Sequence, residues 1–401
     1  MERQIIYLDN NATTAVAPEV FAAMQPYFCE RYGNPSSIHR FGGSIAADIE
    51  KARCQVAGLL GAKFRDKEGC ATEIIFTSCG TESDNAAINA ALNAMPERKK
   101  VVTTAVEHPA VLHYCEELSR KGFTIELIGV DRRGQLDMAA LKNAVDENTA
   151  IVSAMWGNNE TGIIFPVKEI ADIAHSKGAY FHTDAVQAAG KVKIDVEAAG
   201  IDFLSISGHK LHAPKGIGAL YVRRGIIFTP LICGGHQERN RRGGTENTAS
   251  IIGLGKACEM AAANLDEEYR ILKNMRDGFE AKLLASIPRI EINGLGEDRL
   301  PGTSSVSFES IEGESILMLL DVLGICASSG SACTTGSLEP SHVLRAMGVP
   351  YSSAHGTVRF SLSRYNTPEE LDFVAEKLPP IIARLREISP YWEEHRNEKQ
   401  F

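Results

Sequence analysis

Short apolar runs alternate with amphipathic segments through the middle of the chain. The runs predict buried strands at Glu73–Phe76, Val101–Thr104, Ile125–Ile128, Ile151–Met155, Tyr180–Thr183 and Phe203–Ser207. Between several of them, apolar residues recur at helical spacing in Ala110–Lys121, Met138–Val145 and Val167–Lys177. Strands that alternate with helices favour a mostly parallel sheet covered on both faces. Because ligands bind beyond the carboxyl ends of such strands, the residues that follow these runs are the first candidates for a site.

The pattern changes after residue 250. An apolar stripe at helical spacing extends from Ser250 to about Ile287 and predicts one long helix. Beyond it, the pattern predicts three strands and a closing helix, at Ile290–Asn293, Thr303–Phe308, Val358–Ser361 and Pro368–Ile388. The long helix therefore connects the α/β part to a second, smaller domain.

Composition narrows the class of protein. Of 401 residues, 44% are hydrophobic and 23% are charged, the balance of a globular protein with more than one domain. No run approaches the roughly 18 apolar residues of a membrane span, and the N-terminus lacks the apolar stretch of a signal peptide. We therefore expect a cytoplasmic protein without a membrane partner. The net charge of -9 argues against nucleic acid as a partner.

The nine cysteines show no C-x-x-C pair and no zinc-like spacing. Most are predicted to be free thiols that pack as small apolar side chains. Cys333 differs because it lies in Ser-Ser-Gly-Ser-Ala-Cys-Thr-Thr-Gly, from residue 328 to residue 336. A loop so rich in small polar residues buries little, which suits a thiol that must enter and leave a site. An incidental loop thiol is the alternative.

The end of the run Phe203–Ser207 brings a hydroxyl, an imidazole and an amine together in Ser207-Gly-His209-Lys210. A lysine desolvated in a cleft can lose its proton and attack an aldehyde as a Schiff-base nucleophile. Ser207 and His209 could then hold a phosphate nearby. The competing interpretation is a solvated charge after a strand.

Two further strand ends carry candidate chemistry. Asp184 could keep a pyridine nitrogen protonated, with Gln187 donating to a ring oxygen, but a helix N-cap is the competing interpretation of Asp184. Gly80 and Thr81 follow another strand and open an Ala-rich helix, whose N-terminus is either an anion site or a capping box without ligand.

Three single residues add to the pattern. His108 could stack on a flat ring or move a proton, and Asn159 also follows a strand end. Arg359 could pair with a substrate carboxylate through both arms of its guanidinium. Taken alone, an ordinary hydrogen-bonded histidine and a surface arginine are the alternatives.

Together these motifs resemble the cysteine desulfurases of the NifS/IscS branch of the fold-type-I pyridoxal-phosphate (PLP) enzymes. The resemblance covers nearly the whole chain and rests on the order of its motifs: Leu8-Asp-Asn-Asn-Ala-Thr-Thr14, Gly33-Asn-Pro-Ser-Ser37, Thr81-Glu-Ser83, Glu107-His108, Asn158-Asn-Glu160, Asp184–Gln187, Ser207-Gly-His-Lys210, Arg242-Gly-Gly-Thr245 and the segment that ends at Cys333. Cys79 and Ala213 depart from the pattern, since glycine is usual at both positions. Both substitutions are small and remove no functional group.

The resemblance implies an α/β fold with a mostly parallel seven-stranded sheet. It implies a large PLP-binding domain over residues 15–260. A smaller α+β domain, made of residues 1–14 and 261–401, would carry the Cys333 loop. Family members are homodimers, and Thr245 is expected to reach the cofactor of the partner subunit.

The resemblance also assigns roles residue by residue. Lys210 would hold PLP covalently, and Asp184 would pair with the pyridine nitrogen. Gln187 would contact the ring hydroxyl, and His108 would stack on the ring and act in catalysis. The positions that would hold the phosphate are Gly80, Thr81, Ser207 and His209.

The implied reaction converts L-cysteine to L-alanine. Asn159 would contact the cofactor and substrate, and Arg359 the substrate carboxylate. Cys333 would take the sulfur as a persulfide and pass it to an iron–sulfur scaffold protein, with transient cluster ligation by Cys333. The segments Trp156–Gly162 and Asp9–Thr14 favour the nitrogen-fixation type of the family. A selenocysteine lyase or aminotransferase of the same fold, and a non-catalytic assembly scaffold, are the alternatives.

Overall fold

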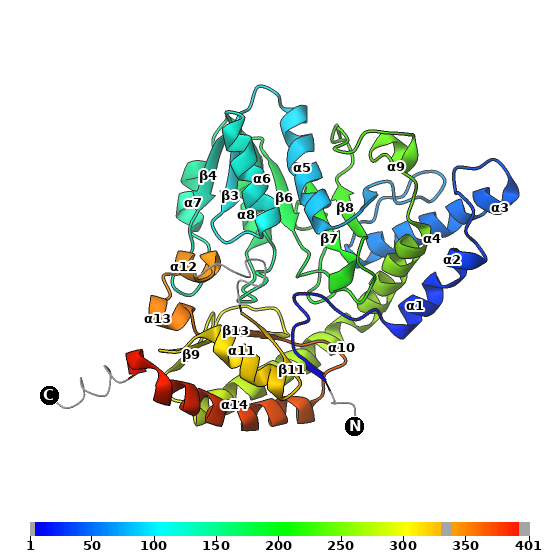
Figure 1. Ribbon diagram of the computed structural model, residues 1–401. Coiled ribbons are helices and arrows are strands. Elements are labelled where there is room, and N and C mark those ends of the chain that lie inside the picture. Colours follow the sequence, from blue (N-terminus) through cyan, green and yellow to red (C-terminus); the bar gives the residue numbers. More distant parts are fainter. Residues whose placement is uncertain (1–4, 330–338, 393–401) are drawn as a thin grey trace.

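A seven-stranded sheet organises the first half of the chain in the computed structural model, which describes residues 5–329 and 339–392 (Figure 1). Its strands lie in the order β2 (Ile74–Thr77), β8 (Gly218–Val222), β7 (Phe203–Ser207), β6 (Tyr180–Asp184), β5 (Thr149–Ser153), β3 (Lys100–Thr104) and β4 (Thr124–Ile128). Every neighbouring pair is parallel apart from the two pairs that β8 forms with β2 and β7. The mostly parallel α/β sheet predicted from the sequence is confirmed.

Two strands differ from the sequence prediction. Strand β4 was expected to be buried, but four of its five residues are at least partly exposed because it forms the edge of the sheet. Strand β8 was not predicted. It is antiparallel because the chain returns directly from β7 through a short turn, in which His212 and Gly216 have positive φ values of 60° and 81°.

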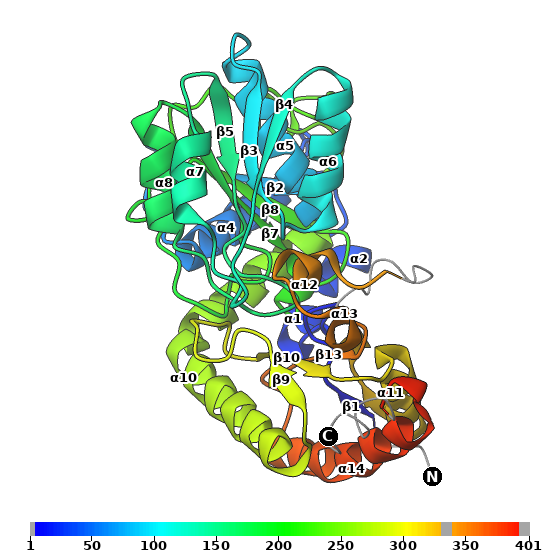
Figure 2. The same ribbon diagram turned by 90° about the vertical axis from the view of Figure 1, so that its left-hand side faces the viewer.

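Helices cover both faces of this sheet (Figure 2). One face carries α5 (Gly80–Ala94) and α6 (Pro109–Arg120), and the other carries α7 (Met138–Ala144) and α8 (Val167–Ser176). Alanines on the buried side of α5 let this helix approach the strands closely. Helix α4 (Ile45–Leu59) packs against α10 (Thr248–Ser286). None of the helices in the described part of the chain combines the length and the apolar character that a membrane crossing requires.

The second half of the chain is built on a four-stranded antiparallel sheet. Its order is β12 (Ser328–Ser329), β13 (Thr357–Ser361), β10 (Thr303–Phe308) and β9 (Ile290–Ile292). Beside it, β1 (Ile6–Tyr7) pairs in parallel with β11 (Ile325–Cys326). Helix α14 (Pro368–Ile388) packs on α10 and α11 (Gly313–Val322) and begins with a capping box between Thr367 and Glu370. The remaining short helices are α1 (Pro18–Met24), α2 (Pro26–Cys29), α3 (Arg40–Gly43), η1 (Gly208–Lys210), α9 (Gln237–Asn240), α12 (His342–Ala346) and α13 (Tyr351–Ala354).

The large sheet has an apolar core on each face and the small sheet has its own, and α10 contributes to one core of each sheet. Leu254 and Cys258 pack in the core of the large sheet, whereas Leu272 and Phe279 pack in the core of the small one. The N-terminal residues Ile6 and Leu8 belong to the core of the small sheet. The proposed boundary at residue 260 falls inside one continuous helix, and the division into domains stays a prediction.

Candidate active site

A cavity of about 530 Å³ lies where the carboxyl ends of β2, β3, β5, β6 and β7 meet. Of the predicted site residues, those that line it are Gly80, Thr81, His108, Asn159, Asp184, Gln187, Ser207, His209, Lys210 and Arg359. Thr245 is exposed and does not line this cavity. Cys333 lies outside the described residues. The structure therefore brings together side chains from six separate motifs.

The amine of Lys210 is held by the N-terminal segment of the chain. Lys210 lies in η1, the tight turn after β7, and its Nζ donates to the carbonyl oxygens of Asn11 at 2.5 Å and Ala12 at 2.7 Å. The neighbouring His209 has its pKa lowered to about 4 by burial and by the positive charges of Lys210 and Lys215. His209 is therefore neutral at pH 7.

His108 is the N-cap of α6, and the hydrogen bond by which its side chain caps the helix fixes its tautomer. Its Nδ1 accepts a hydrogen bond from the backbone N–H of Ala110 at 3.1 Å, so the proton of the neutral ring is on Nε2. Burial lowers the pKa of His108, and the nearby charge of Lys210 lowers it further, although Asp184 acts in the opposite direction. His108 therefore offers a neutral imidazole with an Nε2–H donor.

Two buried carboxyl groups, Asp184 at the end of β6 and Asp84 on α5, lie near each other. Oδ1 of Asp184 accepts from the backbone N–H of Val186 at 2.9 Å, so Asp184 closes a turn and does not cap a helix. Burial and the neighbouring Asp84 raise the pKa of Asp184 to about 7. Burial also raises the pKa of Asp84 to about 7, and its Oδ1 has no hydrogen-bond partner within the described part of the chain. Two carboxyl groups so placed favour a cationic ligand group beside them.

The N-terminus of α5 gives the cavity its anion-binding character. Cys79 precedes the helix without capping it through a side-chain hydrogen bond, so its first N–H groups remain available. A Cβ on Gly80 would come within 2.8 Å of Cγ2 of Val186, and glycine is therefore required for this close approach. The expected capping box does not form, because Glu82 accepts from Ser78 N–H at 2.7 Å. Hydroxyls of Thr81 and Ser207 line the same cavity.

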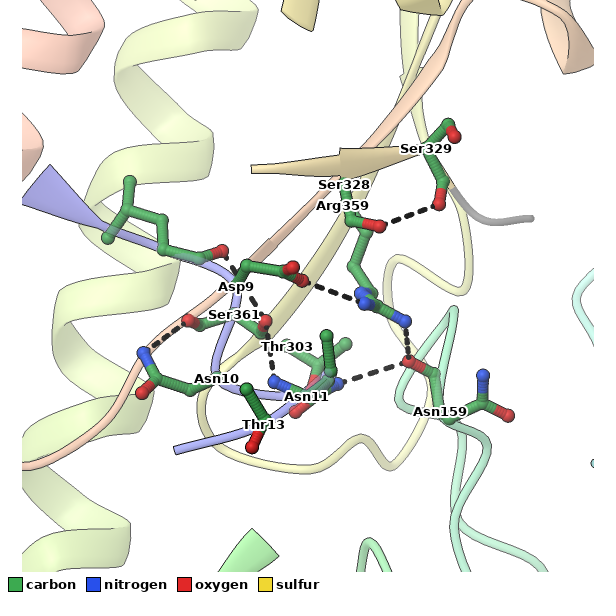
Figure 3. A network of polar contacts seen from close by, with 12 residues as sticks. Asp9, Asn10, Asn11, Thr13, Asn159, Thr303, Ser328, Ser329, Arg359 and Ser361 are labelled. Atoms are coloured by element: carbon green, nitrogen blue, oxygen red, sulfur yellow. Dashed lines mark hydrogen bonds and ion pairs between the residues drawn. The ribbon is translucent and has the colours of Figure 1, made fainter. Parts of the chain in front are cut away.

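Arg359 is buried on β13, at 3% exposure, so the alternative of a surface arginine is wrong. Its guanidinium donates to Oδ1 of Asp9 at 2.9 Å and to the carbonyl oxygen of Asn159 at 3.0 Å (Figure 3). These two bonds use two of the five guanidinium N–H groups, and Nε has no partner among residues 5–329 and 339–392. Donors therefore remain for a carboxylate in the cavity.

Several residues of the site were not singled out from the sequence. Asn11 binds Gln187, Asn159 and Lys210 at once, although it lies more than 140 residues from each of them along the chain. Asp84 lies four residues after Gly80, which places it on the same face of α5, and this spacing could have revealed it. Other lining residues that the sequence did not indicate are Glu160, Ser341 and His342.

The residues that line the cavity fit PLP. Donors at the start of α5 suit a phosphate, the buried carboxyl group of Asp184 suits a pyridinium nitrogen, and Lys210 supplies an amine for the aldehyde. The fit rests on two features of this structure: the close packing that Gly80 allows, and the buried carboxyl pair, in which Oδ1 of Asp84 has no hydrogen-bond partner among the described residues.

Comparison with known proteins gives the class. Residues 6–374 match the family described as aminotransferase class-V, and the chain belongs to this PLP-dependent family. The chain is 56% identical over 387 residues to cysteine desulfurase NifS of Azotobacter vinelandii, an alignment that covers 96% of this chain and 95% of that protein. It is 53% identical over 388 residues to a cysteine desulfurase of Klebsiella pneumoniae, with 97% and 95% covered.

Solved structures agree with this assignment. A structure described as a NifS-like protein has a TM-score of 0.88 and 38% identity, and the match covers 95% of this chain and all of that one. SspA in complex with cysteine has a TM-score of 0.79 and 34% identity, with 90% of this chain and 100% of that chain covered. The predicted family and the predicted fold class are confirmed.

Proposed function

We propose that this chain is a cysteine desulfurase that converts L-cysteine to L-alanine and moves the sulfur to Cys333 as a persulfide. The observation that carries the proposal is the meeting of Lys210, Asp184 and Arg359 around one cavity. Relatives with 53% to 56% identity over nearly the whole chain are cysteine desulfurases, and one similar structure contains cysteine. PLP, when bound, supplies an electron sink for the carbon that loses its proton.

The charge of each residue in the cavity indicates which part of the substrate or cofactor it would bind. Arg359 binds the substrate carboxylate with the N–H groups that do not donate to Asp9 or Asn159. Asp184 holds a proton on the pyridine nitrogen, and Gln187 donates to the ring oxygen. Lys210 would anchor the cofactor, and its amine is placed to take the α-proton of the substrate.

His108 acts as a hydrogen-bond donor in this scheme. Because its Nδ1 already accepts from Ala110, its free polar atom is the protonated Nε2. His108 could therefore stack on the ring and donate a hydrogen bond from Nε2. It could pass on a proton only after gaining one, and protonation at Nδ1 would break the bond from Ala110.

Sulfur transfer follows from the nucleophilicity of a thiolate. The thiolate of Cys333 attacks the substrate sulfur, and an S–S bond forms as the C–S bond breaks. The electron pair of the broken bond stays with the carbon, which takes a proton and leaves as alanine. Cys333 lies outside the described residues, so its role rests on the sequence.

A homodimer and an iron–sulfur scaffold protein are the proposed partners, in the cytoplasm. Large apolar side chains are exposed along residues 21–41, and they are Phe21, Phe28, Tyr32, Ile38 and Phe41. A surface of this kind suits a second copy of the chain. The exposure of Thr245 outside its own cavity agrees with a contact to the partner's cofactor. Cys333 would pass its sulfur to the scaffold and ligate the growing cluster transiently, and nitrogenase maturation is one such route.

The test uses colour and product together. The purified chain with PLP is expected to be yellow and to release sulfide from cysteine in the presence of a reductant. Lys210→Ala should lose both properties, while Lys215→Ala, a change at an exposed lysine in the same turn, should keep both. Cys333→Ala should stay yellow and lose sulfide release from cysteine.

Each alternative has its own outcome in this experiment. A colourless wild-type chain in the presence of PLP would favour the non-catalytic scaffold. Undiminished sulfide release by Cys333→Ala would overturn the persulfide step. Activity of Cys333→Ala on selenocysteine, with none on cysteine, would favour a selenocysteine lyase.

A further inference from the structure

A second lysine lies directly behind the cavity wall. Lys191 follows β6, four residues after Gln187, and is partly buried. Its Nζ donates to Oε1 of Gln187 at 2.8 Å and to Oδ1 of Asn11 at 3.2 Å. Lys191 does not line the large cavity, but it borders a small one of about 40 Å³ together with Lys210. It therefore contacts residues that line the site without reaching a ligand itself.

These two contacts fix how both amide groups are turned. A lysine ammonium group has three N–H donors and no acceptor, so the atoms that face Lys191 are amide oxygens. The amide nitrogen of Gln187 must then point to the carbonyl oxygen of Asn11, 2.9 Å away. One N–H of Gln187 is used in that bond, and the other remains available to the cavity. A ring oxygen that carries negative charge would meet a donor from Gln187 and not the amide oxygen.

The same amine supports the substrate side through Asn11. With its Oδ1 bound to Lys191, Asn11 donates from Nδ2 to the carbonyl oxygen of Asn159 at 3.1 Å. That carbonyl also accepts from Arg359 at 3.0 Å, as Figure 3 shows. The backbone carbonyl of Asn11 accepts from Lys210 at 2.5 Å. Asn11 is thus linked to the cofactor anchor through its backbone carbonyl, and its side chain binds the same Asn159 carbonyl as the carboxylate-binding arginine.

We propose that Lys191 is a positioning residue of the PLP site, which holds the amide of Gln187 with its N–H toward the ring oxygen. This inference rests on the proposed function, because it assigns a PLP contact to Gln187. Lys191 is not a catalytic residue, since it touches neither substrate nor cofactor.

Several charged groups surround Lys191. Burial and the charges of Lys210 and Arg359 lower its pKa to about 7. The other titratable groups that border the small cavity are His212, Glu268 and Arg364. The charged amine has no acceptor and fixes both amide oxygens toward it, whereas the neutral amine keeps two N–H groups, one for each oxygen, but also has a lone pair that accepts. The positioning is therefore firmest when Lys191 is charged.

The experiment measures PLP binding to the cofactor-free chain by absorbance and fluorescence titration. Lys191→Met keeps the length of the side chain and removes the donor. Loss of hydrogen bonds from a lysine predicts a dissociation constant for PLP that rises by about tenfold to a hundredfold. The pH midpoint of the absorption of bound PLP should also move, because the ring oxygen loses a fixed donor. Lys193→Met, two residues away at an exposed position, is the matched control.

Two further variants separate positioning from a general structural role. Lys191→Arg retains donors and should restore the affinity to within about threefold of wild type. In a Gln187→Leu background there is no amide to orient, so Lys191→Met should cost less than about threefold there. If Lys191→Met does not fold, Lys191→Gln replaces it, because its amide ends one bond short of the lysine nitrogen.

The outcomes are distinct from those of the proposed function. If wild type and Lys193→Met do not bind PLP, the proposed function fails and Lys191 has no such role. If they bind PLP and Lys191→Met binds equally well with the same pH midpoint, the positioning role is overturned. A full loss from Lys191→Met that persists in the Gln187→Leu background would also overturn it.

Discussion

The segment that carries Thr245 is held in a strained conformation by a buried ion pair, and Glu238→Gln should release it. Glu238, Arg239 and Asn240 have consecutive left-handed φ values of 47°, 57° and 64°. Arg53 on α4 binds both carboxylate oxygens of Glu238, at 2.6 and 2.9 Å, and the N–H of Phe76 on β2 donates to the same carboxylate at 3.0 Å. The segment is thus clamped to the edge of the large sheet.

The free-energy cost of the left-handed backbone and the stabilisation by the Arg53–Glu238 ion pair are of similar size. Left-handed backbone costs roughly 1–2 kcal/mol for each residue other than glycine, or about 3 to 6 kcal/mol for the three residues. Side-chain exposures of Arg53 and Glu238 are 3% and 4%, so the pair is desolvated. Breaking such a pair from one side costs about 3–5 kcal/mol, because it leaves a buried charge without its partner. Without the carboxylate, the strain is no longer balanced and the segment should open.

Limited proteolysis by trypsin measures this opening, because the segment contains Arg239, Arg241 and Arg242. A local cost of about 3 kcal/mol or more predicts cleavage at least about a hundredfold faster in Glu238→Gln than in wild type. The melting temperature should fall by less than an equal loss in the global free energy of unfolding would cause. Relaxation of the three strained residues recovers part of the lost energy.

Glu50→Gln is the matched control. Glu50 binds Arg53 and also Arg239 of the same segment, both at 3.1 Å, but its side chain is 29% exposed, so each of these pairs should contribute only about 0.2–1 kcal/mol. Cleavage of Glu238→Gln within about threefold of the rate in Glu50→Gln would refute the reasoning, because the clamp would then contribute no more than an exposed pair.

Two further predictions concern the cavity. Asp84 keeps its proton to about pH 7 in the folded chain and ionises near pH 4 when the chain is unfolded. Between these values the folded state binds more protons, so the free energy of unfolding of the cofactor-free chain falls as the pH rises. The contribution of Asp84 to this fall is up to about 1.4 kcal/mol per pH unit. Asp84→Asn should reduce the slope measured in urea titrations at pH 5 and pH 7, and Asp184, whose pKa is also raised to about 7, keeps a contribution of the same sign. A slope equal to that of the exposed control Asp172→Asn would contradict the prediction. Arg359→Lys should raise KM for cysteine by about tenfold to a hundredfold with a smaller change in kcat, because one bidentate contact to the carboxylate is lost. Binding of cysteamine, which has no carboxylate, should not change, and an equal loss for both ligands would point to a general distortion of the site.

Local pattern predicted most of the elements because it depends on neighbouring residues. The strands Thr303–Phe308 and Phe203–Ser207 and the helix Pro368–Ile388 have the predicted bounds. Since parallel strands end at one edge, the pattern also predicted that the residues after them share a site. The pattern could not show that β4 is an edge strand, because a strand's place in the sheet depends on which strands pair with it.

The sequence by itself determined the chemical groups and their order: an amine after one strand, a carboxylate after another and a helix start after a third. Only the tertiary structure decided what surrounds them. Asn11 reaches Lys210 across 199 residues, and Arg359 is buried against Asp9, 350 residues away. The raised pKa values of Asp84 and Asp184 have the same origin, because desolvation and like charge act through space between segments that folding brings together.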